Sequence, residues 1–187
     1  MQTLRFKTAA DFRHWLEQNH VDSDGIWLRI FKKESRQESL SYAEALDQAL
    51  CYGWIDGQKR PFDESSWLQK FTPRNPKSGW SKINTEHVER LTKAELMTPA
   101  GMEAVEAAKA DGRWDAAYSS SRSATPPEDF LAQLSKNAKA EAFFKALNKA
   151  NVYSIVYRLE TAKTPETREK RLKAILAMLE QGKAFHG

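Results

Sequence analysis

Residues 54–82 combine the aromatic and cationic side chains that could bind an anion. The segment holds three Trp and two Phe among six Lys or Arg residues. Guanidinium and ammonium groups donate hydrogen bonds to carboxylate and phosphate oxygens, and a Trp face can stack on a planar group or a base. The segment therefore predicts a binding surface for an anionic ligand. Its candidate residues are Trp54, Asp56, Lys59, Arg60, Trp67, Lys70, Arg74, Asn75 and Trp80.

A purely structural interpretation of the same segment stays open. Tryptophans often hold a sheet against its helices while neighbouring cations cover the ring edges. Side chains alternate between the two faces of a strand, so a strand at 66–72 would place Trp67, Gln69 and Phe71 on one face and Lys70 on the other. Asp56 precedes Gly57, a pair that marks a turn more often than a catalytic acid.

A second cationic region lies near the C-terminus. Residues 136–187 hold eleven Lys or Arg against five Asp or Glu, a net charge of +6, whereas residues 1–135 carry eighteen against twenty, or −2. Spacing of four residues pairs Glu166 with Lys170 and Glu169 with Lys173, which favours a solvated helix face. Arg168 and Arg171 remain the best candidates there for contact with an external anion.

Signatures of common catalytic and metal sites are absent from the sequence. It contains no Gly-x-Ser-x-Gly, no Gly-x-x-x-x-Gly-Lys and no Gly-x-Gly-x-x-Gly, and its four histidines lack metal-ligand spacing. We expect His14 and His87 at solvated helix positions and Cys51 as a small buried apolar residue. No cofactor or metal is expected. An enzyme that assembles acid and base groups only in the fold stays an alternative, with candidates Asp56, Glu64, Lys59 and His87.

Composition limits the class of protein. The 187 residues, with 41% hydrophobic and 29% charged residues, are typical of a folded globular chain. The single cysteine excludes an intramolecular disulfide. No apolar run approaches the roughly 18 to 20 residues of a membrane span, and the first residues lack a signal-peptide core. We therefore expect a cytoplasmic location without a membrane span.

The elements that position these residues follow from capping and periodicity. A strand at 4–7 precedes a helix that begins with the Thr8–Asp11 capping box, and a β-rich run at 26–33 predicts a central strand. The capping box Ser41–Glu44 opens a second helix that ends near Gly53. Two further strands at about 54–62 and 66–72 read as a hairpin. The first 75 or so residues thus predict the order β-α-β-α-β-β.

The rest of the chain predicts helices. One begins near Trp80 or Ser81. Thr98 is expected to cap the next helix, with Pro99 in its first position, and Thr125 to cap another. Thr164-Pro165 starts the last helix, with Thr164 before its first residue, and Gly182 ends it. The fold class is α+β, with a small mixed or antiparallel sheet and helices in the N-terminal half and a helical C-terminal half. The expected organisation is an α+β body at 1–118, a Ser/Pro linker at 119–127 and a basic helical segment at 128–187 packed on the body.

Three blocks of sequence carry a resemblance to a known family. They are residues 49–57, residues 71–84 (from Phe71-Thr72-Pro73-Arg74 to Trp80-Ser81-Lys82-Ile83-Asn84) and residues 162–171, with Gly182-Lys183 following. In this order they resemble the YdeI/OmpD-associated family, which is named for bacteriocin protection and is grouped with YjbR/CyaY-like α+β folds. The resemblance extends over nearly the whole chain. It implies a small bacterial stress- or antimicrobial-tolerance protein and assigns no catalytic residues.

These observations lead to three hypotheses for function, of which binding of an anion is favoured. The first is a non-enzymatic protein that binds an anionic small molecule or an acidic protein partner through its aromatic and basic residues. The alternatives are a single-stranded nucleic-acid binding protein, in which Trp stacks and cations neutralise phosphates, and an uncharacterised enzyme.

Overall fold

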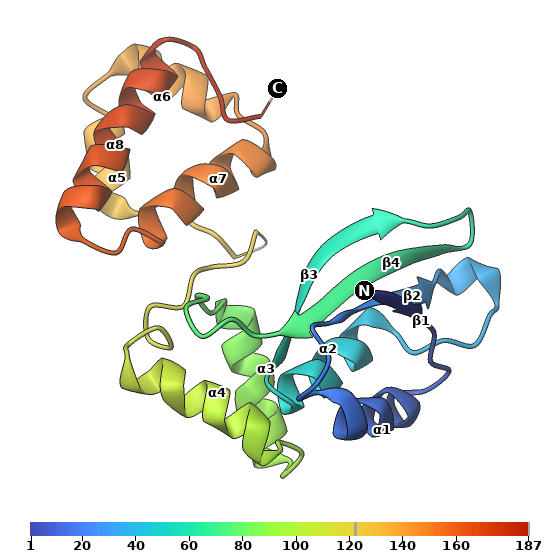
Figure 1. Cartoon of the computed structure of the whole chain (residues 1–187). Helices are drawn as coiled ribbons and strands as arrows, with labels where there is room; N and C mark the ends of the chain where they lie inside the picture. Colours follow the sequence, from blue (N-terminus) through green and yellow to red (C-terminus); the bar gives the residue numbers. More distant parts are fainter. Residues whose placement is uncertain (122, 187) are drawn as a thin grey trace. The chain divides into compact units, whose positions relative to one another are not determined.

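The computed structural model describes residues 1–121 and 123–186 and divides the chain into two compact units (Figure 1). The sheet unit comprises residues 1–78 and 84–115, and the helical unit comprises residues 79–83 and residues 116 onward. Eight helices and a four-stranded sheet occur among the described residues, with about 49% helix and 15% strand. The predicted α+β class is confirmed.

The sheet has the strand order β1-β2-β4-β3. β1 (Gln2–Leu4) runs parallel to β2 (Ile26–Phe31), which pairs antiparallel with β4 (Ser66–Pro73). β3 (Trp54–Pro61) completes the predicted hairpin with β4. The first strand lies earlier than the predicted 4–7, because Phe6 leaves the sheet and packs its ring 5.2 Å from the ring of Phe12.

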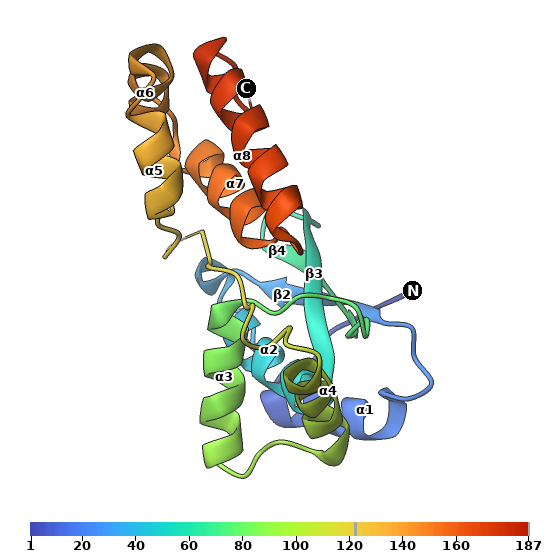
Figure 2. The ribbon, with the colours of Figure 1, turned by 90° about the vertical axis from the view of Figure 1, so that its left-hand side faces the viewer.

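Helices α1 (Ala9–Asn19) and α2 (Tyr42–Cys51) lie on one side of this sheet (Figures 1 and 2). Both predicted capping boxes are present, at Thr8 with Asp11 and at Ser41 with Glu44. Alternate residues of β2 point toward these helices and are buried together with Phe71 of β4. A short 3-10 helix, Lys33–Ser35, follows β2.

Helices α3 (Lys82–Lys93) and α4 (Pro99–Ala110) complete the sheet unit, which contains all but the first two residues of α3. The predicted cap at Thr98 is confirmed, and its hydroxyl also donates a hydrogen bond to the Cys51 carbonyl oxygen at 2.6 Å. Gly101 lets α4 approach the end of α2, because a Cβ at this position would lie 2.2 Å from that oxygen. Cys51 is buried, as predicted.

The helical unit consists mainly of α5 (Glu128–Leu134), α6 (Ala138–Lys145), α7 (Lys149–Glu160) and α8 (Pro165–Glu180). Its core residues come from all four helices: Phe130, Leu134, Ala140, Ile155, Leu159, Ile175 and Leu179. The predicted cap at Thr164 is present, whereas the predicted cap at Thr125 is wrong. α5 instead follows Pro127, which has no side-chain oxygen to accept a capping hydrogen bond.

Residues 79–83 belong to the helical unit through backbone contacts. Ser81 pairs with Tyr118 in a parallel bridge, and the Tyr118 N–H donates to the Trp80 carbonyl oxygen at 2.9 Å. Ser119 then binds Glu160 of α7 through its backbone N–H and its hydroxyl, each at 2.8 Å. The interpretation of 119–127 as a linker stays a prediction, and its residue 122 lies outside the described residues.

Candidate functional site

The β3–β4 hairpin brings cations onto aromatic rings on both of its faces. The Lys59 Nζ atom lies 4.1 Å from the centre of the Trp67 ring, and the Arg60 guanidinium lies 4.0 Å from the Trp27 ring. Neighbouring residues on a strand point to opposite faces, so Lys59 and Arg60 contact rings on different faces of the hairpin. Register places Lys70 opposite Trp27, on the Arg60 face, as the alternation along β4 predicts.

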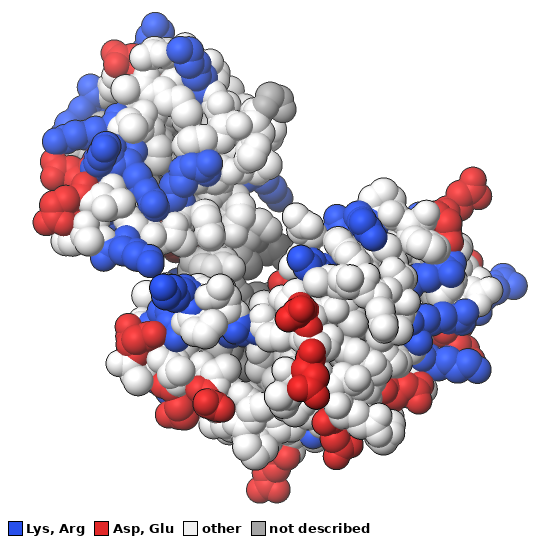
Figure 3. All heavy atoms as spheres, viewed as in Figure 1, with Lys and Arg blue, Asp and Glu red and all other residues white. Residues whose placement is uncertain are grey.

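A groove of about 410 Å³ lies at the end of this hairpin. We call it the hairpin groove, and its lining residues are Lys32, Lys59, Arg60, Pro61, Asp63, Ser66 and Trp67. Three of the predicted site residues, Lys59, Arg60 and Trp67, line it. Figure 3 shows Lys and Arg side chains gathered on the right-hand edge of the sheet unit, below the place where the hairpin ends in Figure 1, with Asp or Glu side chains at that end.

The carboxylate of Asp63, which lines the hairpin groove, is already bound by its neighbours. Asp63 accepts hydrogen bonds from the Ser66 hydroxyl at 2.7 Å and from the Ser65 hydroxyl and N–H at 2.9 Å, and it forms an ion pair with Arg29 at 2.6 Å. These donors, above all the Ser66 hydroxyl, lower the pKa of Asp63 from 3.8 to about 2. Asp63 is therefore ionised at neutral pH, with Arg29 offsetting its charge.

The three cations of the groove form no ion pair with the part of the chain that the structure describes. Among the ion pairs of residues 1–121 and 123–186, none involves Lys32, Lys59 or Arg60. All three side chains are exposed. The groove can consequently supply ammonium and guanidinium donors to an anion, beside the half-buried ring of Trp67.

Asp56 lies on β3 rather than in a turn, which corrects that interpretation. Its carboxylate accepts a hydrogen bond from the Tyr42 hydroxyl at 2.8 Å, and the Tyr42 ring lies 6.1 Å from that of Trp67. Burial and the Asp56 carboxylate both raise the pKa of Tyr42. The pair fixes the N-terminus of α2 against the hairpin, next to Lys59.

Four other predicted residues lie away from the lining of the groove. Trp54 is 1% exposed, donates from Nε1 to the His20 carbonyl oxygen and packs edge-on against Trp15. Trp80 is 2% exposed and belongs to the helical unit. The backbone N–H of Arg74 donates to Gly53, and Asn75 accepts from the Lys77 N–H in a turn.

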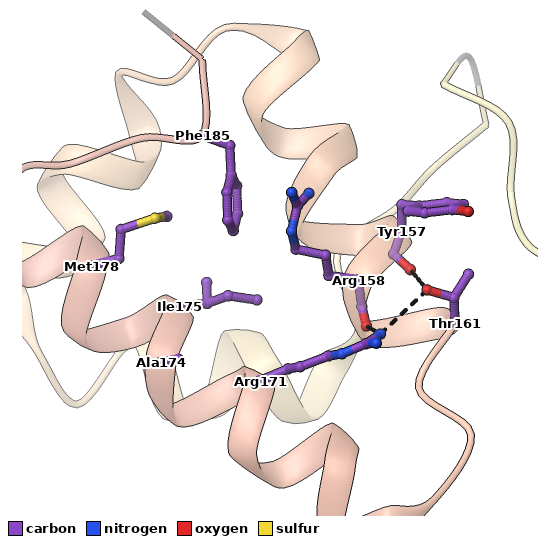
Figure 4. A pocket seen from close by; sticks show the side chains of 8 residues that line it. All are labelled: Tyr157, Arg158, Thr161, Arg171, Ala174, Ile175, Met178 and Phe185. Carbon is purple, nitrogen blue, oxygen red and sulfur yellow. Dashed lines mark hydrogen bonds between the residues drawn. The ribbon is translucent and has the colours of Figure 1, made fainter.

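The two C-terminal arginines differ in their surroundings. Arg168 forms a bidentate ion pair with Asp129, which offsets its charge and lowers the pKa of Asp129. Arg171 donates to the Arg158 carbonyl oxygen at 2.7 Å and lines a separate pocket of the helical unit, drawn in Figure 4. Of the predicted helix pairs, Glu169 with Lys173 is present at 2.6 Å.

Lys32 is the cation of the groove lining that sequence reasoning missed, together with Pro61, Asp63 and Ser66. It follows β2, more than twenty residues before the hairpin, and approaches it because β2 pairs with β4 and because its N–H donates to Ser65 at 2.8 Å. The available signal was its position at the end of a strand predicted to be central. Loops at strand ends are common places for sites.

The side chains of the described residues form no group of three His, Cys, Asp or Glu that could hold a metal ion. His87, expected to be solvated, instead binds Asp47 at 2.7 Å, and Arg90 binds the same carboxylate. This cluster links α3 to α2. No helix in residues 1–121 and 123–186 has the length and apolarity to cross a membrane.

An α+β chain with a basic hairpin groove and a separate helical unit can be placed by its family matches. Residues 4–104, more than half of the chain, match a domain family of unknown function, DUF8412, and the chain belongs to this family. Residues 123–182 match the family described as bacteriocin-protection, YdeI or OmpD-associated. Searches of curated proteins and of solved structures found no match.

These matches confirm the predicted resemblance for the C-terminal part of the chain. The block at 162–171 lies inside the bacteriocin-protection match, whereas the blocks at 49–57 and 71–84 lie outside it and both lie inside the match to the domain family of unknown function. The similarity to YjbR/CyaY-like folds stays a prediction.

Proposed function

We propose that this chain is a non-enzymatic binding protein that takes an anionic ligand, or an acidic segment of a partner, in the hairpin groove. Its role would be in bacterial tolerance of bacteriocins or related antimicrobial stress, and its location cytoplasmic. The family match of residues 123–182 supports the role at the level of the family. The groove supports the binding activity.

The observation that carries the proposal is the arrangement of charge in the groove. Lys32, Lys59 and Arg60 line it without an ionic partner among the described residues, while Asp63 is held by Arg29 and two serines. Two of the cations also lie on Trp rings, which limits the side-chain entropy lost when an anion binds. Such a site binds carboxylate or phosphate groups with little rearrangement.

A titration with three anions tests the proposal. Pyrophosphate, a hexaglutamate peptide and a short thymidine oligonucleotide would each be titrated into the protein by calorimetry. The double variant Lys59→Gln/Arg60→Gln should bind the probe of highest affinity at least about tenfold more weakly, because each charge-assisted hydrogen bond contributes about 1.5–3 kcal/mol.

Lys33→Gln provides the matched control. Lys33 is exposed, neighbours Lys32 in sequence and does not line the groove, so the variant removes one charge without changing the site. If both variants weakened anion binding equally, the anion would be attracted unspecifically to a basic surface, and the proposal would be contradicted. Failure of all three probes to bind would also contradict it.

Single-stranded nucleic acid is the second candidate, favoured by the half-buried Trp67 ring beside Lys59. A base could stack at this ring while cations bind the phosphates. In that case the oligonucleotide would bind best, and its affinity would fall steeply between low and moderate salt. An affinity that is constant over this range excludes this candidate.

A further inference from the structure

The helical unit contains a pocket of its own, independent of the hairpin groove. Its volume is about 540 Å³, within the roughly 300–1,000 Å³ of small-molecule sites. The lining includes Arg158 of α7, Arg171, Ala174, Ile175 and Met178 of α8, and Phe185 of the C-terminal tail. Figure 4 shows the Phe185 ring between Met178 and Arg158, with Ile175 below it.

A buried asparagine fixes the tail that supplies the Phe185 wall. The Asn151 Oδ1 atom accepts hydrogen bonds from the N–H groups of Phe185 at 3.0 Å and His186 at 2.9 Å, and its Nδ2 donates to the His186 carbonyl oxygen at 3.1 Å. His186 also bonds the Ser154 hydroxyl through Nε2 at 2.8 Å. The apolar wall is thus held in place without a ligand.

Both arginines of the pocket retain hydrogen-bonding capacity. Arg158 lies 3.8 Å from the centre of the Phe185 ring, and its one side-chain hydrogen bond to residues 1–121 and 123–186 runs from Nη1 to the Ser154 carbonyl oxygen. Arg171 donates from Nη1 to Arg158 and Thr161, at the C-terminal end of α7. A guanidinium has five N–H donors, so each has several left.

No carboxylate of the described residues forms an ion pair with Arg158 or Arg171, in contrast to the Arg168–Asp129 pair on the same unit. Both side chains are half-buried. A partly desolvated cation without a counter-ion is electrostatically costly and gains much from an anion that binds beside it.

We propose that this pocket binds a small organic anion with an apolar body, such as a medium-chain or aromatic carboxylate. The carboxylate would accept hydrogen bonds from a pocket guanidinium, and the apolar body would lie against Ile175, Met178 and Phe185. Inorganic phosphate matches the charge and leaves the apolar walls uncovered. A neutral hydrocarbon matches the walls and leaves the arginines without an anion.

Octanoate is the probe that tests this proposal, with octanol as the chain without charge and acetate as the charge without chain. Binding to the full chain would be followed by the NMR signals of the Met178 methyl and the Ile175 methyls. Octanoate should shift both signals in a saturable way and leave the methyls of Ile30, in the sheet unit, unchanged. Octanol and acetate should bind at least about tenfold more weakly.

Two substitutions separate the site from general charge. Arg158→Gln should weaken octanoate binding by about tenfold or more. Lys170→Gln removes one exposed charge from α8 outside the pocket and should leave the affinity within about twofold. Ala174→Phe, which adds a ring at the pocket lining, should abolish the Met178 and Ile175 shifts in a protein with unchanged helical circular dichroism.

The proposal is overturned if octanoate leaves both methyl signals unshifted at millimolar concentration. It is equally overturned if Lys170→Gln weakens binding as much as Arg158→Gln, or if octanol binds as tightly as octanoate. Because the hairpin groove shares no residue with this pocket, these results are independent of the anion titration described above.

Discussion

At the scale of single residues, the positive charge of the hairpin groove depends on how Asp63 is bound. Two serines and Arg29 together hold its carboxylate, and the Ser66 hydroxyl has the largest effect on its pKa. Without these donors Asp63 would be free to pair with Lys59 or Arg60 and would compete with an external anion. The electrostatics of the groove can therefore be tested at this residue.

Substitution of Ser66 by alanine should raise the pKa of Asp63 from about 2 toward its ordinary value of 3.8. Ser65→Ala should cause a smaller rise, because the Ser65 N–H continues to donate. The carboxyl carbon signal of Asp63, followed by NMR as the pH is lowered, gives the midpoint directly. An unchanged midpoint in Ser66→Ala would contradict the assigned cause.

The same carboxylate predicts a pH dependence of stability. Its pKa is lower in the folded chain than in the unfolded chain, so its stabilising contribution is complete above about pH 4 and is lost as the pH falls toward about 2. As the pH is lowered through this window, the melting temperature of the wild-type protein should therefore fall further than that of the Asp63→Asn variant. If the melting temperatures of the two proteins fell by the same amount over this pH range, Asp63 would not contribute to the pH dependence of stability.

At the scale of elements, the approach of α4 to α2 depends on a missing side chain. A Cβ on Gly101 would lie 2.2 Å from the Cys51 carbonyl oxygen and 2.9 Å from that of Leu50, both of them backbone atoms that cannot move aside cheaply. We expect Gly101→Ala to destabilise the protein by about 1–3 kcal/mol. Urea unfolding measures this change.

Gly57→Ala serves as the comparison for Gly101→Ala. A Cβ on Gly57 would meet its nearest atom, on Lys70, at an ordinary contact distance of 3.7 Å. We expect a change in unfolding free energy within about 0.5 kcal/mol. Equal destabilisation by the two substitutions would contradict the role of close helix packing at Gly101.

The C-terminal tail is a second element whose position depends on one residue. Asn151→Ala removes the acceptor for two backbone N–H groups and the donor to His186. We expect a loss on the order of 2 kcal/mol, with faster amide exchange at Phe185 and His186. Asn137→Ala, which removes only the α6 cap, should cost about 1 kcal/mol and leave the tail protected.

Local signals explain which elements were predictable. Ser41 and Glu44 form a capping box from their own side chains, so neighbouring residues alone define the start of α2. The αL conformation at Gly53 and Gly182 likewise depends only on the absence of a Cβ. α5 lacks such a cap, and tertiary packing of Phe130 stabilises it instead.

The site was less predictable, because it depends on pairing between distant segments. Lys59, Arg60 and Trp67 were predicted because all three lie in one aromatic and basic run. Lys32 joins them only through the β2–β4 register. The sequence could not show that the Trp54 ring is buried in the core, because the position of a Trp in the sequence does not indicate whether its ring packs inside or faces solvent.

At the scale of the whole molecule, charge and family assignment both differ between the two parts. Figure 3 shows many Lys and Arg side chains on the helical unit, in agreement with the +6 of residues 136–187. Part of this charge is paired within the unit, as in Arg168 with Asp129 and Lys145 with Glu141. Arg158 and Arg171, which form no ion pair with the described residues, line a pocket. The net charge of the unit is therefore larger than the charge that its outer surface presents to an anion.

The helical unit has its own core, which predicts a local response to core damage. Phe130 is fully buried, and its ring lies 5.5 Å from that of Phe144. Phe130→Ala should cost about 3–5 kcal/mol and increase amide exchange in α5–α8, while β2 and β4 keep their protection. Simultaneous loss of protection in both units would contradict independent cores.

The central claim is that the hairpin groove binds anions, and amide NMR mapping tests it most directly. Titration of pyrophosphate should shift the amide signals of residues 59–67 and of Lys32 in a saturable way, and the Lys59→Gln/Arg60→Gln variant should lose these shifts. Shifts that appear only in α8, or that are the same in the variant and the wild type, would contradict the claim.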